Sequence, residues 1–114
     1  MRPTVVIVDD HAEFRAAARA VLEAGGFDVV GEAVDAAEAV ALAARLRPQV
    51  VLLDIQLPDR DGFAVAEELG DGPHVVLTSS RDARAYGRRL QTARVRGFIA
   101  KRELTGQALA ALVV

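Results

Sequence analysis

The chain has 114 residues, of which 52% are hydrophobic and 26% are charged, and it contains no cysteine. This length and apolar content predict one folded domain, and the lack of cysteine excludes disulfides and cysteine-based zinc sites. The formal net charge of −2, from 14 basic and 16 acidic residues, argues against direct nucleic-acid binding by this chain. Acidic residues interrupt every long apolar stretch, so we expect a cytoplasmic protein without a signal peptide or membrane span.

The first half of the chain alternates apolar runs with helical repeats. Residues 5–8 predict a buried strand, and a helix up to two glycines should follow, with an apolar face made of Phe14, Ala17, Ala18, Val21 and Leu22. Residues 28–33 are polar at both ends, which predicts a strand at or near a sheet edge. A second helix ends before Pro48, and its expected apolar face comprises Ala37, Val40, Ala41 and Ala44.

The second half continues this alternation. Residues 50–54, an apolar run that ends on Asp54, are typical of a strand buried on both faces of a parallel sheet. The next expected elements are helices over about 62–69 and 81–93 and strands over 74–78 and 97–100. Gly87 should make the 81–93 helix the least stable, since glycine costs about 1 kcal/mol relative to alanine. A last helix is expected after Thr105 as its N-cap, with an inner face of Ala108, Leu109 and Leu112.

Alternation of this kind predicts right-handed crossovers and a parallel sheet with helices on both faces. The carboxyl ends of parallel strands share one rim, where α/β sheets bind ligands. The expected strands end there on five polar residues, namely Asp9, Asp10, Asp54, Thr78 and Lys101. Three carboxylates repel one another unless a cation joins them, which suits Mg²⁺. An amine and a hydroxyl beside them suit a phosphoryl group that transfers to Asp54 as nucleophile.

Four segments carry a resemblance to a known family. In order and spacing, Val8–His11, Leu53–Gly62, Leu77–Ser80 and Gly97–Lys101 resemble the response-regulator receiver domain of two-component signalling. The opening Asp-Asp-His and the lack of proline after Lys101 are similar to the subgroup that is joined to a LuxR/NarL-type helix-turn-helix domain. The resemblance implies a receiver domain over residues 1–114 with the doubly wound flavodoxin-like (CheY-like) α/β fold, a (βα)5 parallel sheet in strand order 2-1-3-4-5.

The resemblance also implies how the rim residues act. Asp54 would accept a phosphoryl group from a histidine kinase or a phosphotransfer protein. Asp10 would coordinate Mg²⁺ (or Mn²⁺) directly and Asp9 mainly through water, with Asp54 and the backbone carbonyl of Gln56 as further ligands. Lys101 would bind a phosphate oxygen.

A second group of residues would transmit the signal. Thr78 and Phe98 would form the switch, while Gln56 and Ser80 would flank the phosphate and set its lifetime. The expected function is therefore a phosphorylation-activated switch and not an enzyme acting on other molecules. Phosphorylation would shift the fourth helix, fifth strand and fifth helix, control an output domain or partner, and allow a homodimer to form.

Other functions stay open beside this one. The chain could be a receiver-like interaction module that is never phosphorylated. A Mg²⁺-dependent phosphohydrolase would need a second aspartate where this chain has Gln56, and a flavin phosphate would be repelled by Asp9 and Asp10. His11 and His74 are expected to be surface residues without a role. Because no further domain follows Val114, we expect a stand-alone regulator or the receiver portion of a longer protein.

Overall fold

Five parallel strands form one sheet in the order β2-β1-β3-β4-β5 in the computed structural model, which describes residues 2–113. The strands are β1 (Thr4–Val8), β2 (Asp28–Ala33), β3 (Val50–Asp54), β4 (His74–Ser79) and β5 (Gly97–Ala100). All five residues of β3 are buried, because strands flank it on both sides and helices cover both faces. The order confirms the predicted doubly wound fold, and β2 takes the predicted edge position.

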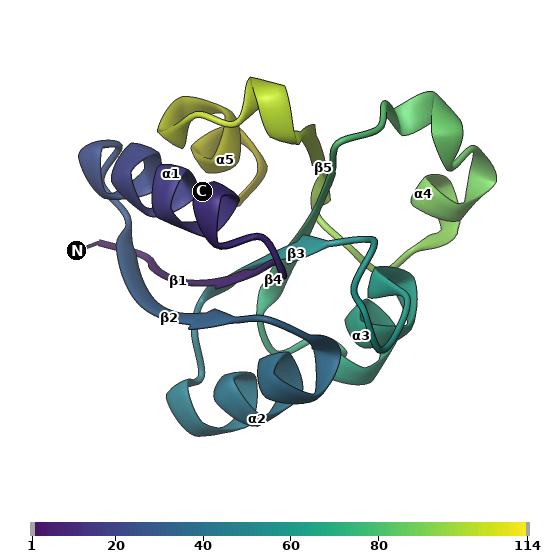
Figure 1. Ribbon diagram of the computed structural model, residues 1–114, viewed down its shortest axis with the longest axis horizontal. Coiled ribbons are helices and arrows are strands. Elements are labelled where there is room, and N and C mark those ends of the chain that lie inside the picture. Colours follow the sequence, from purple (N-terminus) through teal and green to yellow (C-terminus); the bar gives the residue numbers. More distant parts are fainter. Residues whose placement is uncertain (1, 114) are drawn as a thin grey trace.

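The helices form a layer on each face of the sheet (Figure 1), with α1 and α5 on one face and α2 and α3 on the other. They are α1 (Ala12–Ala24), α2 (Ala36–Leu46), α3 (Gly62–Leu69), α4 (Arg88–Thr92) and α5 (Gly106–Val113). Alternate residues of β1 serve the two layers, so that Val5 and Ile7 pack with α1 while Val6 and Val8 pack with α2. Among residues 2–113, no helix has the length and apolarity that a membrane crossing requires.

The predicted apolar face of α1 is only partly right. Ala18 and Leu22 are buried, whereas Ala17 is exposed and Val21 keeps 39% of its surface in solvent. Six of the thirteen residues of α1 are alanine, which fits either a buried or an exposed position. Periodicity alone therefore does not identify the residues of α1 that are buried, Ala18 and Leu22, which pack against β1.

The predicted apolar face of α2 is wrong for a related reason. The helix buries Ala36 and Ala39 and leaves the expected Ala37 exposed. Its first turn is fixed from outside, because the Asp59 carboxylate accepts hydrogen bonds from the backbone N–H groups of Ala36 at 2.8 Å and Ala37 at 3.1 Å. Asp35 caps the same turn by accepting from the Glu38 N–H at 2.8 Å. Of the rest of the predicted face, Val40 is half-buried, and Ala41 and Ala44 are exposed.

The predicted helix over residues 81–93 is broken in two. A 3₁₀ turn covers Ala83–Ala85, Gly87 adopts φ +53°, and α4 then spans five residues. Positive φ suits glycine and ends the helix, which is a stronger effect than the low helix propensity that we expected. No residue from 81 to 93 is buried. In Figure 1 this segment projects from the side of the molecule.

The expected last helix is confirmed, together with its cap. The Thr105 hydroxyl oxygen accepts a 2.9 Å hydrogen bond from the backbone N–H of Ala108. Leu109 is fully buried, and Ala108 and Leu112 pack beside it in the core layer shared with α1.

Candidate functional site

The strand register brings the polar strand ends to one rim. Val8 of β1 lies opposite Leu53 of β3, so Asp9 and Asp54, the next residues, emerge side by side. Asp54 lies opposite Thr78 of β4, and Lys101 directly follows β5. The structure therefore brings together all five residues that the sequence placed at this rim.

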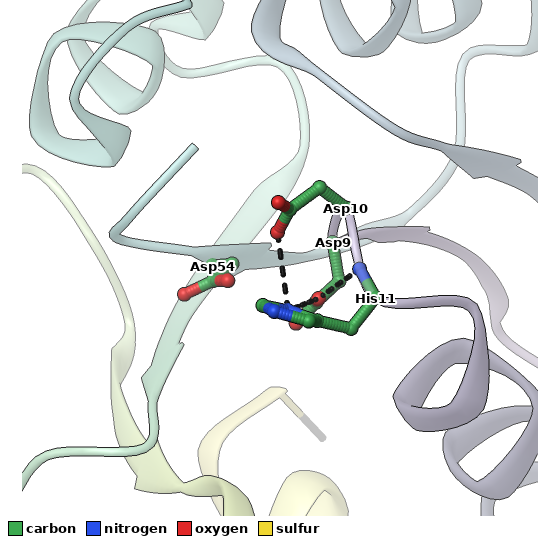
Figure 2. A group of neighbouring side chains, drawn as sticks. All are labelled: Asp9, Asp10, His11 and Asp54. Carbon is green, nitrogen blue, oxygen red and sulfur yellow. Dashed lines mark hydrogen bonds and ion pairs between the residues drawn. The ribbon is translucent and has the colours of Figure 1, made fainter. Parts of the chain in front are cut away.

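Three aspartates and one histidine form an acidic cluster at the centre of this rim. Each of Asp9, Asp10, His11 and Asp54 offers one potential ligand atom, and these atoms lie within 4.8 Å of one another. Figure 2 shows the four side chains gathered where β1 and β3 end. Asp9 and Asp54 are 0% and 3% exposed, whereas Asp10 and His11 face solvent. The cluster thus joins a buried floor to an open edge that a ligand can reach.

A single ammonium group compensates the two buried carboxylates. Lys101 Nζ lies 2.5 Å from Asp9 Oδ2 and 3.3 Å from Asp54 Oδ2. It also lies 4.6 Å from the centroid of the Phe14 ring, in cation–π contact. Burial lowers the Lys101 pKa, but hydrogen bonding and attraction to Asp9 and Asp54 outweigh this and raise the pKa above its usual value. The lysine stays charged, yet one cation cannot neutralise two buried anions.

The pKa of the Asp54 carboxyl reflects this incomplete neutralisation. Burial, followed by repulsion from Asp9, raises the pKa of the Asp54 carboxyl from 3.8 to about 6, against the opposing effects of Lys101 and a backbone hydrogen bond. That bond is donated to Asp54 Oδ1 by the backbone N–H of Gln56 at 3.2 Å. The carboxylate is therefore short of positive charge in its surroundings.

A divalent cation fits this site. Apart from the Lys101 contact, Asp9 Oδ2 has no hydrogen-bond partner among the residues that the structure describes, although it is buried. The Lys101 ammonium is thus the one cationic contact of this oxygen among the described residues, and a metal ion would supply the further positive charge that two buried carboxylates need. Clustered carboxylates are the oxygen ligands that hard divalent cations prefer. The acidic cluster could therefore hold a metal.

Thr78 lies at the rim, but its hydroxyl faces β5 and not Asp54. The side chain is fully buried, and Oγ1 donates a 2.6 Å hydrogen bond to the backbone carbonyl of Ile99. Phe98, the residue before Ile99, is half-buried and packs against the core layer of α2 and α3. In this arrangement one expected switch residue, Phe98, belongs to β5, and the other, Thr78, is bonded to the next residue of that strand.

Tyr86 links these residues to the segment before α4, a role that the sequence did not reveal. Its ring centroid lies 6.2 Å from that of Phe98 and 5.9 Å from that of Phe63, both in tilted arrangements. Its hydroxyl lies 2.6 Å from the hydroxyl of Ser79, the residue after Thr78. Helical periodicity could not reveal this contact, because a tertiary hydrogen bond leaves no mark on it.

Gln56 and Ser80 both lie at the rim, with exposed side chains. Gln56 follows Asp54 by two residues and forms an isolated antiparallel bridge with Asp61. Ser80 follows Thr78 by two residues. Both positions suit contact with a group bound at Asp54, and nothing in the described residues shows such a contact.

His11 is a surface residue, as expected, and it lies beside the acidic cluster. Its side chain is 68% exposed, as expected of a surface residue, but Nδ1 lies 3.1 Å from Oδ1 of both Asp9 and Asp10. The adjacency of His11 to the Asp-Asp pair was the available signal. His74 is exposed at the first residue of β4, the end of that strand opposite Thr78.

Comparison with known proteins identifies the family of this fold and site. The family model for the response regulator receiver domain matches residues 5–113. A Pseudomonas aeruginosa protein whose name describes a transcriptional regulator is 40% identical over 111 residues, which cover 94% of this chain and 53% of that protein. The transcriptional regulatory protein PdtaR of Mycobacterium tuberculosis is 41% identical over 83 residues, which cover 68% of this chain and 40% of PdtaR. The chain spans about half the length of the curated relatives it matches.

Among solved structures, the signal receiver domain of NarL from Mycobacterium tuberculosis superposes with a TM-score of 0.83 at 33% identity. That match covers 97% of this chain and 96% of the NarL chain. A LuxR-family two-component response regulator from Aurantimonas superposes with a TM-score of 0.88 at 26% identity, covering 99% of this chain and 86% of that chain.

Proposed function

This chain belongs to the response regulator receiver domain family, and on that premise we propose that it is a phosphorylation-controlled switch whose phosphoacceptor is Asp54. One observation carries the assignment: the buried Asp54 carboxylate lies against the Lys101 ammonium and the other aspartates at the open rim. Asp54 is the last residue of β3, the middle strand of the sheet, and its carboxylate can attack a phosphorus atom that enters at this rim.

The acidic cluster would hold Mg²⁺ (or Mn²⁺) through Asp9, Asp10, Asp54 and the backbone carbonyl of Gln56. When bound, such an ion offsets the negative charge that accumulates as a carboxylate and a phosphoryl group approach each other. Two buried carboxylates that share the single Lys101 ammonium support this assignment, as does the raised pKa of the Asp54 carboxyl. Asp10, at the exposed edge, leaves room for water and for a phosphate oxygen.

In the transfer step, an Asp54 carboxylate oxygen attacks the phosphorus of a phosphohistidine on a kinase or phosphotransfer protein. The new O–P bond forms as the N–P bond of the donor breaks, and the leaving nitrogen takes the bonding electron pair. Lys101 turns from the two carboxylates to an oxygen of the transferred group. The phosphoryl group is lost by hydrolysis: water attacks the phosphorus, the Asp54 O–P bond breaks, and inorganic phosphate leaves as the Asp54 carboxylate re-forms. Gln56 and Ser80, two exposed residues near Asp54, would set the phosphate lifetime.

The phosphorylated rim offers Thr78 a second partner. Its hydroxyl would leave the Ile99 carbonyl and donate to a phosphate oxygen, and Phe98 would repack against the core. The segment before α4 would follow, because Tyr86 contacts both Phe98 and Ser79 while no residue of that segment is buried. A weakly packed element of this kind can be shifted by a few kcal/mol of differential binding. The changed α4, β5 and α5 surface would then control an output domain, a partner or a homodimer.

The relatives suggest what the switch controls. They are named as transcription regulators and are about twice as long as this chain. We therefore propose that this receiver controls transcription through a DNA-binding output region, with a histidine kinase or phosphotransfer protein upstream. The chain assists its own phosphorylation and dephosphorylation and has no other substrate in this proposal.

The test uses a small phosphodonor. The purified chain is incubated with Mg²⁺ and acetyl phosphate, and its intact mass is measured together with the inorganic phosphate released. We expect a single added phosphoryl group, none in Asp54→Asn, and normal labelling in the control Asp71→Asn, whose side chain is 83% exposed. Rapid phosphate release over many turnovers would instead indicate a phosphohydrolase. Metal binding without labelling would indicate an interaction module that is not phosphorylated.

A further inference from the structure

We propose that His11 is a further metal ligand of the acidic cluster, which gives the site a nitrogen donor for borderline first-row cations such as Ni²⁺, Zn²⁺ and Co²⁺. The inference rests on the proposed function, because it concerns the same cation site. It goes further because it assigns to the exposed imidazole of His11 a preference for these cations over Mg²⁺, a selectivity that oxygen ligands alone would not give.

The distances around the imidazole fit a shared ion. His11 Nδ1 lies 3.1 Å from Oδ1 of Asp9 and 3.1 Å from Oδ1 of Asp10. Neighbouring ligand atoms of an octahedral ion with bonds of about 2.1 Å are about 3.0 Å apart. Figure 2 shows the ring beside both carboxylates, with its nitrogen on the side that faces them. One ion could therefore contact all three groups with little movement of the side chains.

A backbone hydrogen bond holds residue 11 beside the acidic cluster. The His11 backbone N–H donates a 2.8 Å hydrogen bond to Asp9 Oδ1, which ties the start of the residue to the buried carboxylate. The side chain does not serve as a cap for α1, although His11 stands at the N-cap position. The polar contacts of the imidazole are therefore those with Asp9 and Asp10, and replacing it should not remove a capping interaction.

Ligand chemistry separates the two kinds of ion. Mg²⁺ is hard, prefers oxygen and keeps several waters, so its affinity should depend mainly on the aspartates. Imidazole is a favoured ligand of nickel, zinc and copper, whose affinities exceed those of earlier divalent metals at a given site. A neutral imidazole that coordinates through Nδ1 needs its proton on Nε2, which can donate to water because the side chain is 68% exposed.

The chain provides a matched control, since His11 and His74 are its two histidines. The chelator-treated protein is titrated calorimetrically with Ni²⁺ and, separately, with Mg²⁺, as wild type, His11→Gln and His74→Gln. Even outer-sphere partners of metal ligands contribute about 10-fold to 100-fold in affinity, so loss of a direct ligand should weaken Ni²⁺ binding at least about tenfold. Mg²⁺ affinity should change less than about threefold in His11→Gln, and His74→Gln should change neither.

A spectroscopic readout separates ligation from a hydrogen bond. In protein labelled with ¹⁵N-histidine, diamagnetic Zn²⁺ should shift the His11 Nδ1 resonance and leave that of His74 in place. If His11→Gln binds Ni²⁺ as tightly as the wild type does, or if Zn²⁺ binds without moving the Nδ1 resonance, the imidazole is no ligand. That result leaves the phosphorylation proposal standing as long as Mg²⁺ still supports labelling at Asp54. If neither Mg²⁺ nor Ni²⁺ binds the wild-type chain, both proposals fail.

Discussion

Thr78 Oγ1 donates a 2.6 Å hydrogen bond to the backbone carbonyl of Ile99. The bond joins the carboxyl ends of β4 and β5 inside the protein, and Thr78 lies opposite Asp54 in the neighbouring ladder. Thr78 therefore neighbours the proposed phosphoacceptor on one side, and its hydroxyl is bonded to β5, the strand that carries Phe98, on the other.

The first prediction concerns that hydroxyl. Thr78→Val keeps the shape of the side chain but leaves the Ile99 carbonyl without its donor, so the free energy of unfolding should fall by about 1–3 kcal/mol in urea denaturation. The variant should still be labelled at Asp54, yet labelling should no longer move the Phe98 amide resonance. Thr78→Ser, which retains the hydroxyl, should respond like the wild type. A Phe98 shift of normal size in Thr78→Val would remove Thr78 from the switch.

The second prediction separates two effects of Lys101. In Lys101→Met the ammonium no longer competes for the carboxylates of Asp9 and Asp54, so Mg²⁺ should bind more tightly, by about fivefold for one unit charge near 4 Å in water. Labelling by acetyl phosphate should nevertheless become slower, because no cation is left to bind the phosphate oxygen. Arg102→Met, a neighbouring exposed position, serves as the control for both measurements. Faster labelling in Lys101→Met would show that the lysine only balances charge.

The third prediction follows from the raised pKa of Asp54, which is about 6 in the folded chain against 3.8 as its usual value. Between these pH values the folded chain binds more protons than the unfolded chain, so this group makes stability fall as pH rises from about 4 to 6. Asp54→Asn should therefore be more stable than the wild type at pH 7, by roughly 1–2 kcal/mol, and no more stable below pH 4.

Magnesium provides the internal control for this pH dependence. Mg²⁺ should narrow the difference between Asp54→Asn and the wild type at pH 7, because a cation favours the ionised carboxylate that only the wild type carries. Chemical denaturation across this pH range, with and without Mg²⁺, measures both effects. A wild type that is more stable than the variant at pH 7 without metal would contradict the charge imbalance inferred at this site.

The fourth prediction tests the backbone that supports the site. A Cβ atom on Gly62 would lie 2.6 Å from the Asp54 carbonyl oxygen and 2.7 Å from the Ile55 Cα, and neither backbone atom can move away cheaply. Gly62→Ala should lower the free energy of unfolding by about 1–3 kcal/mol and slow labelling at Asp54. In the control Gly72→Ala, the new Cβ would meet nothing closer than 3.9 Å. Equal stability of the two variants would show that the turn after β3 can relax.

The sequence predicted the sheet and its rim because both depend on strong local signals. A short apolar run that ends on Asp54 marks a central strand, and parallel pairing then places Asp9, Thr78 and Lys101 beside it. The helix faces were harder to predict, since alanine, which fits either side of a helix, is frequent in α1 and α2. The sequence also did not reveal that Asp59, 23 residues away from Ala36, accepts a hydrogen bond from its N–H in the first turn of α2.

The missed parts of the site are tertiary contacts. Tyr86 reaches Ser79 through a hydroxyl contact, and His11 reaches two carboxylates through Nδ1; no periodic pattern records either contact. The break at Gly87 was foreseen only as a loss of stability. In the structure, Gly87 divides the predicted helix in two, because glycine can adopt the positive φ found between the 3₁₀ turn and α4.

The most direct test is to locate the phosphoryl group. After incubation with acetyl phosphate and Mg²⁺, the protein is reduced with borohydride, which converts an aspartyl phosphate to homoserine, and its peptides are sequenced by mass spectrometry. We predict homoserine at position 54 and at no other aspartate. Phosphate on the intact protein with an unmodified residue 54, or homoserine at position 9 or 10 instead, would contradict the assignment of Asp54 as the phosphoacceptor.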